Sequence, residues 1–114
     1  HALMDAILSA IGEKDIGHLF PVDDSRYDDA DSIELLQAVL KKATDKGRAL
    51  QNVSVAIIAE RPMLAPYIDQ MRNNMSHVLR IPCERIGITA TTNEQVGDLG
   101  DCKSIACFAT ALLQ

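Results

Sequence analysis

The stretch from Asn52 to Ala59 constrains the fold more than any other part of the sequence. In an extended strand its apolar side chains fall on both faces, with Val53, Val55 and Ile57 on one and Ala56 and Ile58 on the other. A strand that is apolar on both faces is buried on both, which is typical of the centre of a sheet. The chain is therefore expected to build a sheet around this segment.

The remaining patterns predict helices and strands in alternation. Apolar residues at helical spacing and glycine stops predict helices, and β-branched runs predict strands. The predicted helices span residues 1–12, 31–46 and 66–79, and the predicted strands span residues 52–59, 86–92 and 104–113. The run 104–113 also fits a helix by periodicity, but Ile105, Phe108 and Thr110 favour a strand.

This order of elements favours an α+β fold, a sheet with helices packed on one face. The 114 residues allow one domain, residues 1–114. The opposite face of the sheet also needs cover, and other copies of the same chain are the most economical cover for a chain this short. The pattern therefore predicts a closed homo-oligomer.

Composition excludes several classes of function. The 16 acidic residues outnumber the 11 basic ones, and a net charge of -5 gives no attraction to nucleic acid or to anionic membranes. No apolar run is long enough to span a bilayer. The cysteines include no C-x-x-C pair and favour free thiols in a reducing compartment such as the cytoplasm. These thiols are Cys83, Cys102 and Cys107.

The sequence begins at His1, inside a helical pattern and without a capping residue before it. We therefore expect further residues to precede His1. His1 and Asp5 lie one helical turn apart, which is the spacing of helical metal sites and also that of ordinary surface pairs. His18 and His77 are expected to face solvent or to be hydrogen-bonded.

Residues 13–30 form a polar, turn-rich segment of the length that functional loops often have. Within it, Asp15-Ile16-Gly17 sets a carboxylate beside a glycine, an arrangement that suits the two hydroxyls of a ribose and equally suits a plain turn. The carboxylates that follow predict a solvated acidic face, with a hard-cation site as the alternative. They are Asp23, Asp24, Asp28 and Asp29.

Thr91-Thr92-Asn93-Glu94 closes a predicted strand and opens a loop that contains Gly97 and Gly100. Hydroxyls and backbone amides at such a junction can hold phosphate oxygens, and Glu94 could bind a divalent cation that bridges them. The alternative is a loop cap without a ligand.

Taken together, these segments resemble the 2-C-methyl-D-erythritol 2,4-cyclodiphosphate synthase family of the non-mevalonate isoprenoid pathway. The resemblance spans the whole chain and depends on the order and spacing of several short motifs. They are His1-Ala2-Leu3 with Asp5, Asp15-Ile16-Gly17, Leu19-Phe20-Pro21, Ala30-Asp31-Ser32, Ile57 to Pro62, Gln70-Met71-Arg72, Ala90 to Glu94 with Gly97, and Ile105-Ala106-Cys107. Family members carry about forty residues before the histidine that matches His1, including an Asp-x-His zinc pair.

The resemblance implies a homotrimer, with sheets facing the trimer axis and active sites between subunits. It also implies a cyclase, a phosphorus-oxygen lyase, that converts 4-diphosphocytidyl-2-C-methyl-D-erythritol 2-phosphate to the cyclodiphosphate and releases CMP. The expected cofactors are Zn²⁺ or another divalent transition metal, and Mg²⁺ or Mn²⁺. A fused or partner cytidylyltransferase is a possible companion. A plastid is the expected location if the source organism has one.

The same resemblance assigns roles to residues. His1 would bind zinc, Glu94 would bind Mg²⁺, Thr92 together with Thr91 would polarise the phosphates in the transition state, and Asp5 would be a nearby polar support. The ribose would be held by Asp15, Ile16 and Gly17, the methylerythritol end by Phe20, Pro21, Val22, Asp23 and Asp24, the cytosine by Ala59, Glu60, Arg61, Pro62, Met63, Leu64 and Ala65, and the phosphates by Thr91, Thr92, Asn93 and Glu94.

Some positions depart from the family pattern. Asp101 stands where an arginine is usual, which places an anion near a polyanionic substrate. The other departures are Asp98 for an aromatic residue, Lys103-Ser104 for Glu-Gly, Met63 for a lysine and Val22 for an aspartate. Two alternatives to the enzyme therefore stay open: a trimeric cytidine-nucleotide-binding module with weakened catalysis, and an interaction protein built on the apolar trimer face.

Overall fold

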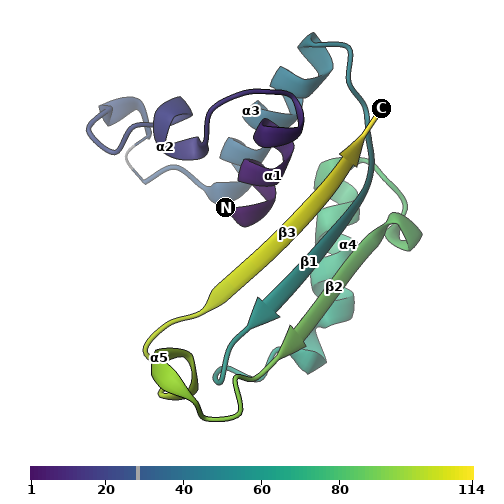
Figure 1. The fold of residues 1–114 in the computed structure, drawn as a ribbon. Coiled ribbons are helices and arrows are strands. Elements are labelled where there is room, and N and C mark those ends of the chain that lie inside the picture. The colour runs from purple at the N-terminus through teal and green to yellow at the C-terminus, as the bar shows by residue number, and fades with distance from the viewer. Residues whose placement is uncertain (28) are drawn as a thin grey trace.

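The computed structural model describes residues 1–27 and 29–114, and within these residues the strands form one three-stranded sheet. Strand β1 (Leu50–Ile58) lies between β2 (Ile86–Thr91) and β3 (Ala106–Leu113). It runs parallel to β2 and antiparallel to β3 (Figure 1). The central strand predicted from its two apolar faces is confirmed.

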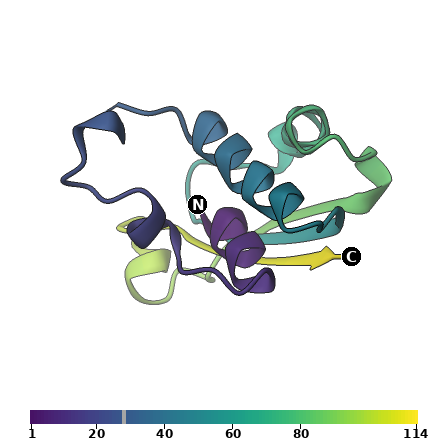
Figure 2. The same ribbon diagram turned by 90° about the horizontal axis from the view of Figure 1, so that it is seen from above.

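The long helices pack on one face of this sheet (Figure 2). Helix α1 (Ala2–Ala10) contacts β3, α4 (Ile68–Leu79) contacts β2, and α3 (Ser32–Asp45) packs against both α1 and α4. Parallel strands need a long crossover connection, and α4 provides it between β1 and β2. The α+β architecture with helices on one face is thus confirmed.

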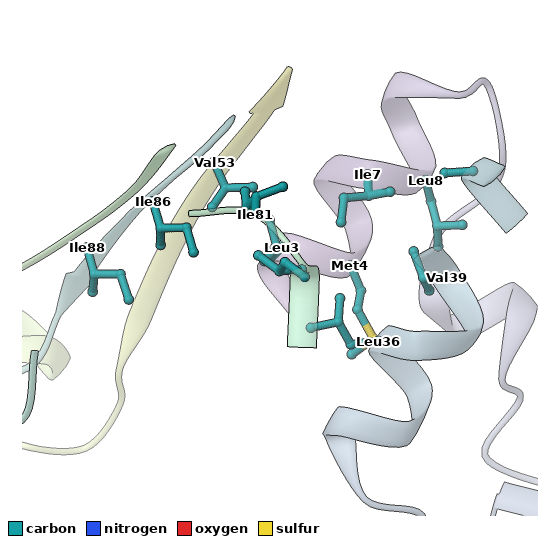
Figure 3. Close-up of a cluster of buried hydrophobic side chains, with 12 residues drawn as sticks. Leu3, Met4, Ile7, Leu8, Leu36, Val39, Val53, Ile81, Ile86 and Ile88 are labelled. Carbon is teal, nitrogen blue, oxygen red and sulfur yellow. The ribbon is translucent and has the colours of Figure 1, made fainter. Parts of the chain in front are cut away.

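The core lies between α1, α3 and the sheet (Figure 3). Ile7, Leu8 and Val39 have no exposed surface, and Met4 is 2% exposed. These side chains come from the apolar stripes of two amphipathic helices, which face each other above the strands.

The ends of the helices follow local chemistry. Asp31 caps α3, since its Oδ1 accepts a hydrogen bond from the Ile33 N–H at 2.8 Å. Gly47, two residues after α3, has a φ of 74°, as its predicted role as a helix stop requires. Helix α4 ends at Leu79, and Arg80 adopts the left-handed conformation before Ile81 and Pro82 continue the chain.

The ends of the predicted helices and strands differ from the structure by one or two residues. The segment 13–30 is not a plain loop, because it contains the short helix α2 (Ile16–Leu19) and a 3₁₀ turn at Ser25–Tyr27. The last strand begins at Ala106 rather than at Ser104. The carboxylate of Asp28, assigned above to an acidic face, lies outside the described residues.

The sheet face opposite the helices carries large apolar side chains. Phe108 and Leu112 of β3 are 65% and 58% exposed, and they point away from Ala109, Ala111 and Leu113, which pack into the core.

Among the described residues, no helix combines the length and apolarity needed to cross a membrane.

Candidate functional site

The carboxyl ends of the parallel strands β1 and β2 bring two of the predicted segments together. Ile58, the last residue of β1, pairs with Thr91, the last residue of β2, and the Ala59 N–H donates to the Thr91 carbonyl at 3.0 Å. Polar loops at such an edge are a common place for ligands in folds with parallel strands. A cavity of about 110 Å³ opens here, lined by Ala59, Glu60, Met63, Leu64, Ala65, Ala90, Thr91 and Thr92.

Residues 91–94, which we call the phosphate turn after the role predicted for them from the sequence, lead from the last residue of β2 into a turn at Glu94 and Gln95. Thr91, Thr92 and Glu94 are exposed. The Thr92 Oγ1 accepts a hydrogen bond from the Glu94 N–H at 3.3 Å, which leaves the hydroxyl proton of Thr92 free to donate to a ligand. Glu94 and Gln95 have φ values of 54° and 61°, so the chain reverses sharply and presents the Glu94 carboxylate to solvent.

The loop after the phosphate turn folds back on it. The Asn93 side chain donates to the Val96 carbonyl at 2.8 Å, and the Val96 N–H donates to the Asn93 carbonyl at 3.0 Å. Helix α5 (Gly97–Gly100) follows, and a Cβ on Gly100 would lie 2.1 Å from the carbonyl carbon of Gln95. Only glycine allows this close approach, which keeps the loop compact.

A single side chain joins the two segments. The Glu60 Oε2 accepts a hydrogen bond from the Asn93 N–H at 3.1 Å, across 33 residues of sequence. The predicted role of the 59–65 segment involved its backbone, so this use of the Glu60 carboxylate was missed. The signal available in the sequence was an acidic residue directly after a buried strand.

The third predicted segment centres on Asp15, which caps α2. The Asp15 Oδ1 accepts hydrogen bonds from the His18 ring Nδ1 at 2.7 Å and from the His18 N–H at 3.1 Å. The ring bond first, and then the backbone bond, lowers the pKa of Asp15 below its ordinary value. The exposed carboxylate is therefore ionised at neutral pH and able to accept ribose hydroxyls. His18 is hydrogen-bonded, as expected, and the Asp-x-x-His spacing was the signal for this pair.

Asp5 anchors this segment to α1. Its Oδ1 accepts a hydrogen bond from the Ile16 N–H at 2.8 Å, in a partly buried position. The role of polar support suggested for Asp5 fits this bond.

His1 is exposed, and its Nε2 lies 3.3 Å from the Ser32 Oγ. Within the described part of the chain, no group of three or more His, Cys, Asp or Glu residues could hold a metal ion.

The residues predicted to cover the methylerythritol end form a separate small cluster. The Phe20 and Tyr27 rings meet edge to face with centroids 5.0 Å apart. Asp24 accepts hydrogen bonds from the Arg26 guanidinium, the shortest at 2.6 Å, and these bonds lower its pKa. Val22 is 98% exposed. This arrangement leaves Asp23 and Val22 facing solvent at the tip of the loop.

Within one chain the structure does not bring all predicted site residues together. Figure 1 shows α2, which Asp15 caps, beside α1 and α3 and apart from the carboxyl ends of β1 and β2. Residues 59–65, which we call the nucleobase segment after their predicted role, form one group with the phosphate turn. Residues 15–24 form another group.

Fold and site together define an α+β domain whose polar loops gather at the carboxyl edge of a parallel strand pair. The chain belongs to the YgbB family, whose model matches residues 1–114. It is 47% identical over 114 residues to a 2-C-methyl-D-erythritol 2,4-cyclodiphosphate synthase of Geotalea uraniireducens, and it covers 73% of that protein. A synthase of the same name from Synechocystis is 45% identical over 113 residues, and this chain covers 70% of that protein.

Solved structures agree with this assignment. The chain matches a 2C-methyl-D-erythritol-2,4-cyclodiphosphate synthase in a CDP-bound form with a TM-score of 0.90 and 35% identity, over 100% of this chain and 73% of the other. It matches the bifunctional IspDF of Campylobacter jejuni with a TM-score of 0.94 and 35% identity, over 99% of this chain and 31% of the other. The family predicted from the motifs is confirmed.

Proposed function

We propose that this protein is a 2-C-methyl-D-erythritol 2,4-cyclodiphosphate synthase and that the residues described above form parts of its active site. The substrate is 4-diphosphocytidyl-2-C-methyl-D-erythritol 2-phosphate. An oxygen of the 2-phosphate bonds to the β-phosphorus, and the bond from that phosphorus to the bridging oxygen breaks. CMP leaves with that oxygen, so no further reactant is needed.

One observation carries the proposal: the nucleobase segment and the phosphate turn, far apart in sequence, close on a single cavity at the ends of two parallel strands. A base in the cavity would place its attached phosphates along the exposed turn. Family membership over the whole chain supports the same function, and it favours the synthase over a binding module or an interaction protein.

The phosphate turn would neutralise charge on the diphosphate. The Thr92 hydroxyl donates to a phosphate oxygen, and Thr91 lies beside it, so negative charge that develops during transfer finds a fixed donor. Magnesium usually binds through one or two carboxylates together with substrate phosphates, and the exposed Glu94 fits this role. When bound, the ion supplies charge neutralisation and orientation of the phosphates.

The nucleoside would bind through both groups of residues. Backbone groups of residues 59–65 recognise the base, while Asp15 and Gly17 hold the ribose. The base would bind in the cavity of about 110 Å³ that residues 59–65 form with the end of β2. Residues 20–24 cover the methylerythritol end of the substrate.

A trimer would place these groups side by side. The exposed Phe108 and Leu112 provide an apolar face that other copies can cover, with the sheets turned toward the trimer axis. The cleft between two copies would then combine residues 15–24 of one chain with residues 59–65 and 91–94 of its neighbour. We further propose that the protein is a cytosolic enzyme that is fused to a cytidylyltransferase or works together with one.

Zinc does not fit the described residues alone. A catalytic zinc site uses three protein ligands. In the described part of the chain, His1 belongs to no group of three or more His, Cys, Asp or Glu residues that could hold a metal ion. His1 is suited to be one ligand, because its ring is exposed and its Nε2 is held near the Ser32 hydroxyl. The steps above therefore depend on groups other than zinc.

The test is release of CMP from the cytidine diphosphate substrate by the purified protein, with and without Mg²⁺. Glu94→Gln is expected to lower kcat by about 10²-fold or more, because one charged group at the phosphates is lost. Glu84→Gln, an exposed carboxylate outside the site, is the matched control and keeps wild-type activity. Binding of CMP without any turnover would replace this proposal with the binding module.

A further inference from the structure

Glu60 occupies a particular place between the two halves of the candidate site. It follows β1 by two residues and is partly buried, whereas Arg61, Pro62 and Met63 after it are exposed. Its carboxylate is engaged within the protein, since Oε2 accepts a hydrogen bond from the Asn93 N–H at 3.1 Å. A bond between an ionised carboxylate and a backbone N–H is among the stronger hydrogen bonds in proteins.

Among the residues that the structure describes, Glu60 is the only acceptor of a hydrogen bond from the Asn93 N–H. The parallel pairing of β1 with β2 ends at Thr91, and within the turn the Thr92 Oγ1 is used by the Glu94 N–H. The Asn93 carbonyl and side chain are engaged with Val96. Asn93 is itself partly buried, so without Glu60 its N–H would lose its partner where water reaches poorly.

The turn also needs an external anchor for conformational reasons. Glu94 and Gln95 are consecutive non-glycine residues in the left-handed region, a conformation that persists only when the surroundings impose it. The bond from Glu60 holds the residue directly before this pair. It therefore fixes the direction in which Thr92 and Glu94 are presented.

We propose that Glu60 is a positioning residue that couples the nucleobase segment to the phosphate turn. This inference rests on the proposed function. When a base occupies the cavity that Glu60 lines, the carboxylate holds the turn in the conformation that directs the Thr92 hydroxyl and the Glu94 carboxylate at the phosphates. Its loss should lower kcat more than it raises KM, because binding of the base does not need the turn while the transfer step does.

The experiment compares Glu60→Ala, Glu60→Gln and the control Glu84→Ala in the purified protein. The glutamine keeps an acceptor oxygen at the same reach, so we expect it to stay within about threefold of wild type in kcat, while alanine lowers kcat by about tenfold with a smaller change in KM. Amide exchange of Asn93 and Glu94, followed by NMR, should be about tenfold faster in Glu60→Ala and unchanged in Glu84→Ala.

The outcomes separate this inference from the proposed function. If Glu60→Ala keeps the wild-type exchange rate at Asn93, or if its kcat stays within twofold of wild type, the positioning role is wrong. A loss of activity that is matched by a loss of folded protein in circular dichroism, and that glutamine does not rescue, would overturn it as well. If the wild-type protein releases no CMP, yet Glu60→Ala speeds exchange in the turn, the proposed function fails while Glu60 remains the anchor.

Discussion

Arg72 offers a sharp test of how the scaffold beneath the site is held. From α4, its Nε donates to the Ile86 carbonyl at 3.0 Å, and its Nη2 donates to the Cys83 carbonyl at 2.7 Å, which fixes the start of β2. A hydrogen bond from a charged group contributes about 1.5–3 kcal/mol, and partial burial favours the lower end of that range. We therefore expect Arg72→Ala to lower the free energy of unfolding by about 2–4 kcal/mol.

Arg72→Lys should lower the free energy of unfolding by about 1–2 kcal/mol, because one ammonium group cannot replace the planar guanidinium that donates to both carbonyls. Urea unfolding at a fixed protein concentration measures both losses. With a slope of about 1.5 kcal/mol per M, a loss of about 3 kcal/mol lowers the midpoint by about 2 M. Arg85→Ala, an exposed arginine in the turn before β2, is the control. A midpoint for Arg72→Ala no lower than that of Arg85→Ala would refute the reasoning.

Three further predictions concern the core, the acidic range and assembly. Leu8→Ala, at a fully buried position, should lower the free energy of unfolding by about 2–5 kcal/mol in the same urea assay. The pKa of Asp15 is lowered in the folded state, so the stability it contributes is present above its unfolded pKa of about 3.9 and is lost as the pH falls through the lower, folded pKa. His18→Ala should raise that pKa toward its ordinary value in a ¹³C NMR titration, and an unchanged titration would contradict the assignment. Phe108→Glu should reduce the mass measured by light scattering to that of a monomer, while Val22→Glu, at an exposed loop tip, should leave it unchanged.

The elements that sequence analysis predicted share a repeated signal. The central strand β1 carries apolar residues on both faces. Helices cover one face of the sheet, and Phe108 and Leu112 of the neighbouring strand β3 make the other face apolar as well. Helix α3 carries both a capping Asp31 and an apolar stripe. Helix α2 was missed because four residues are too few to show a period, and its start is held by two carboxylates, the capping Asp15 and Asp5, which accepts from the Ile16 N–H.

The candidate site was predictable only in part. The Thr91–Glu94 junction and the Asp15 segment were visible as polar residues at the ends of apolar runs, and the family resemblance named them. The sequence offered Glu60 as an acidic residue after a buried strand but not its partner Asn93, because the bond depends on β1 and β2 being parallel and in a register that pairs Ile58 with Thr91. Side-chain patterns indicate which faces of a strand are buried and not which neighbour lies beside it.

The separation of α2 from the carboxyl ends of β1 and β2 within one polypeptide has a genetic consequence for Asp15, which caps α2, and Glu94, which follows β2. If every cleft draws these two residues from different subunits, an inactive protein altered at Asp15 and another altered at Glu94 would each retain what the other lacks. Refolded together in equal amounts, they would rebuild intact clefts in about one quarter of cases, since each cleft samples two neighbours at random. Two dead alleles expressed in one cell would then complement each other.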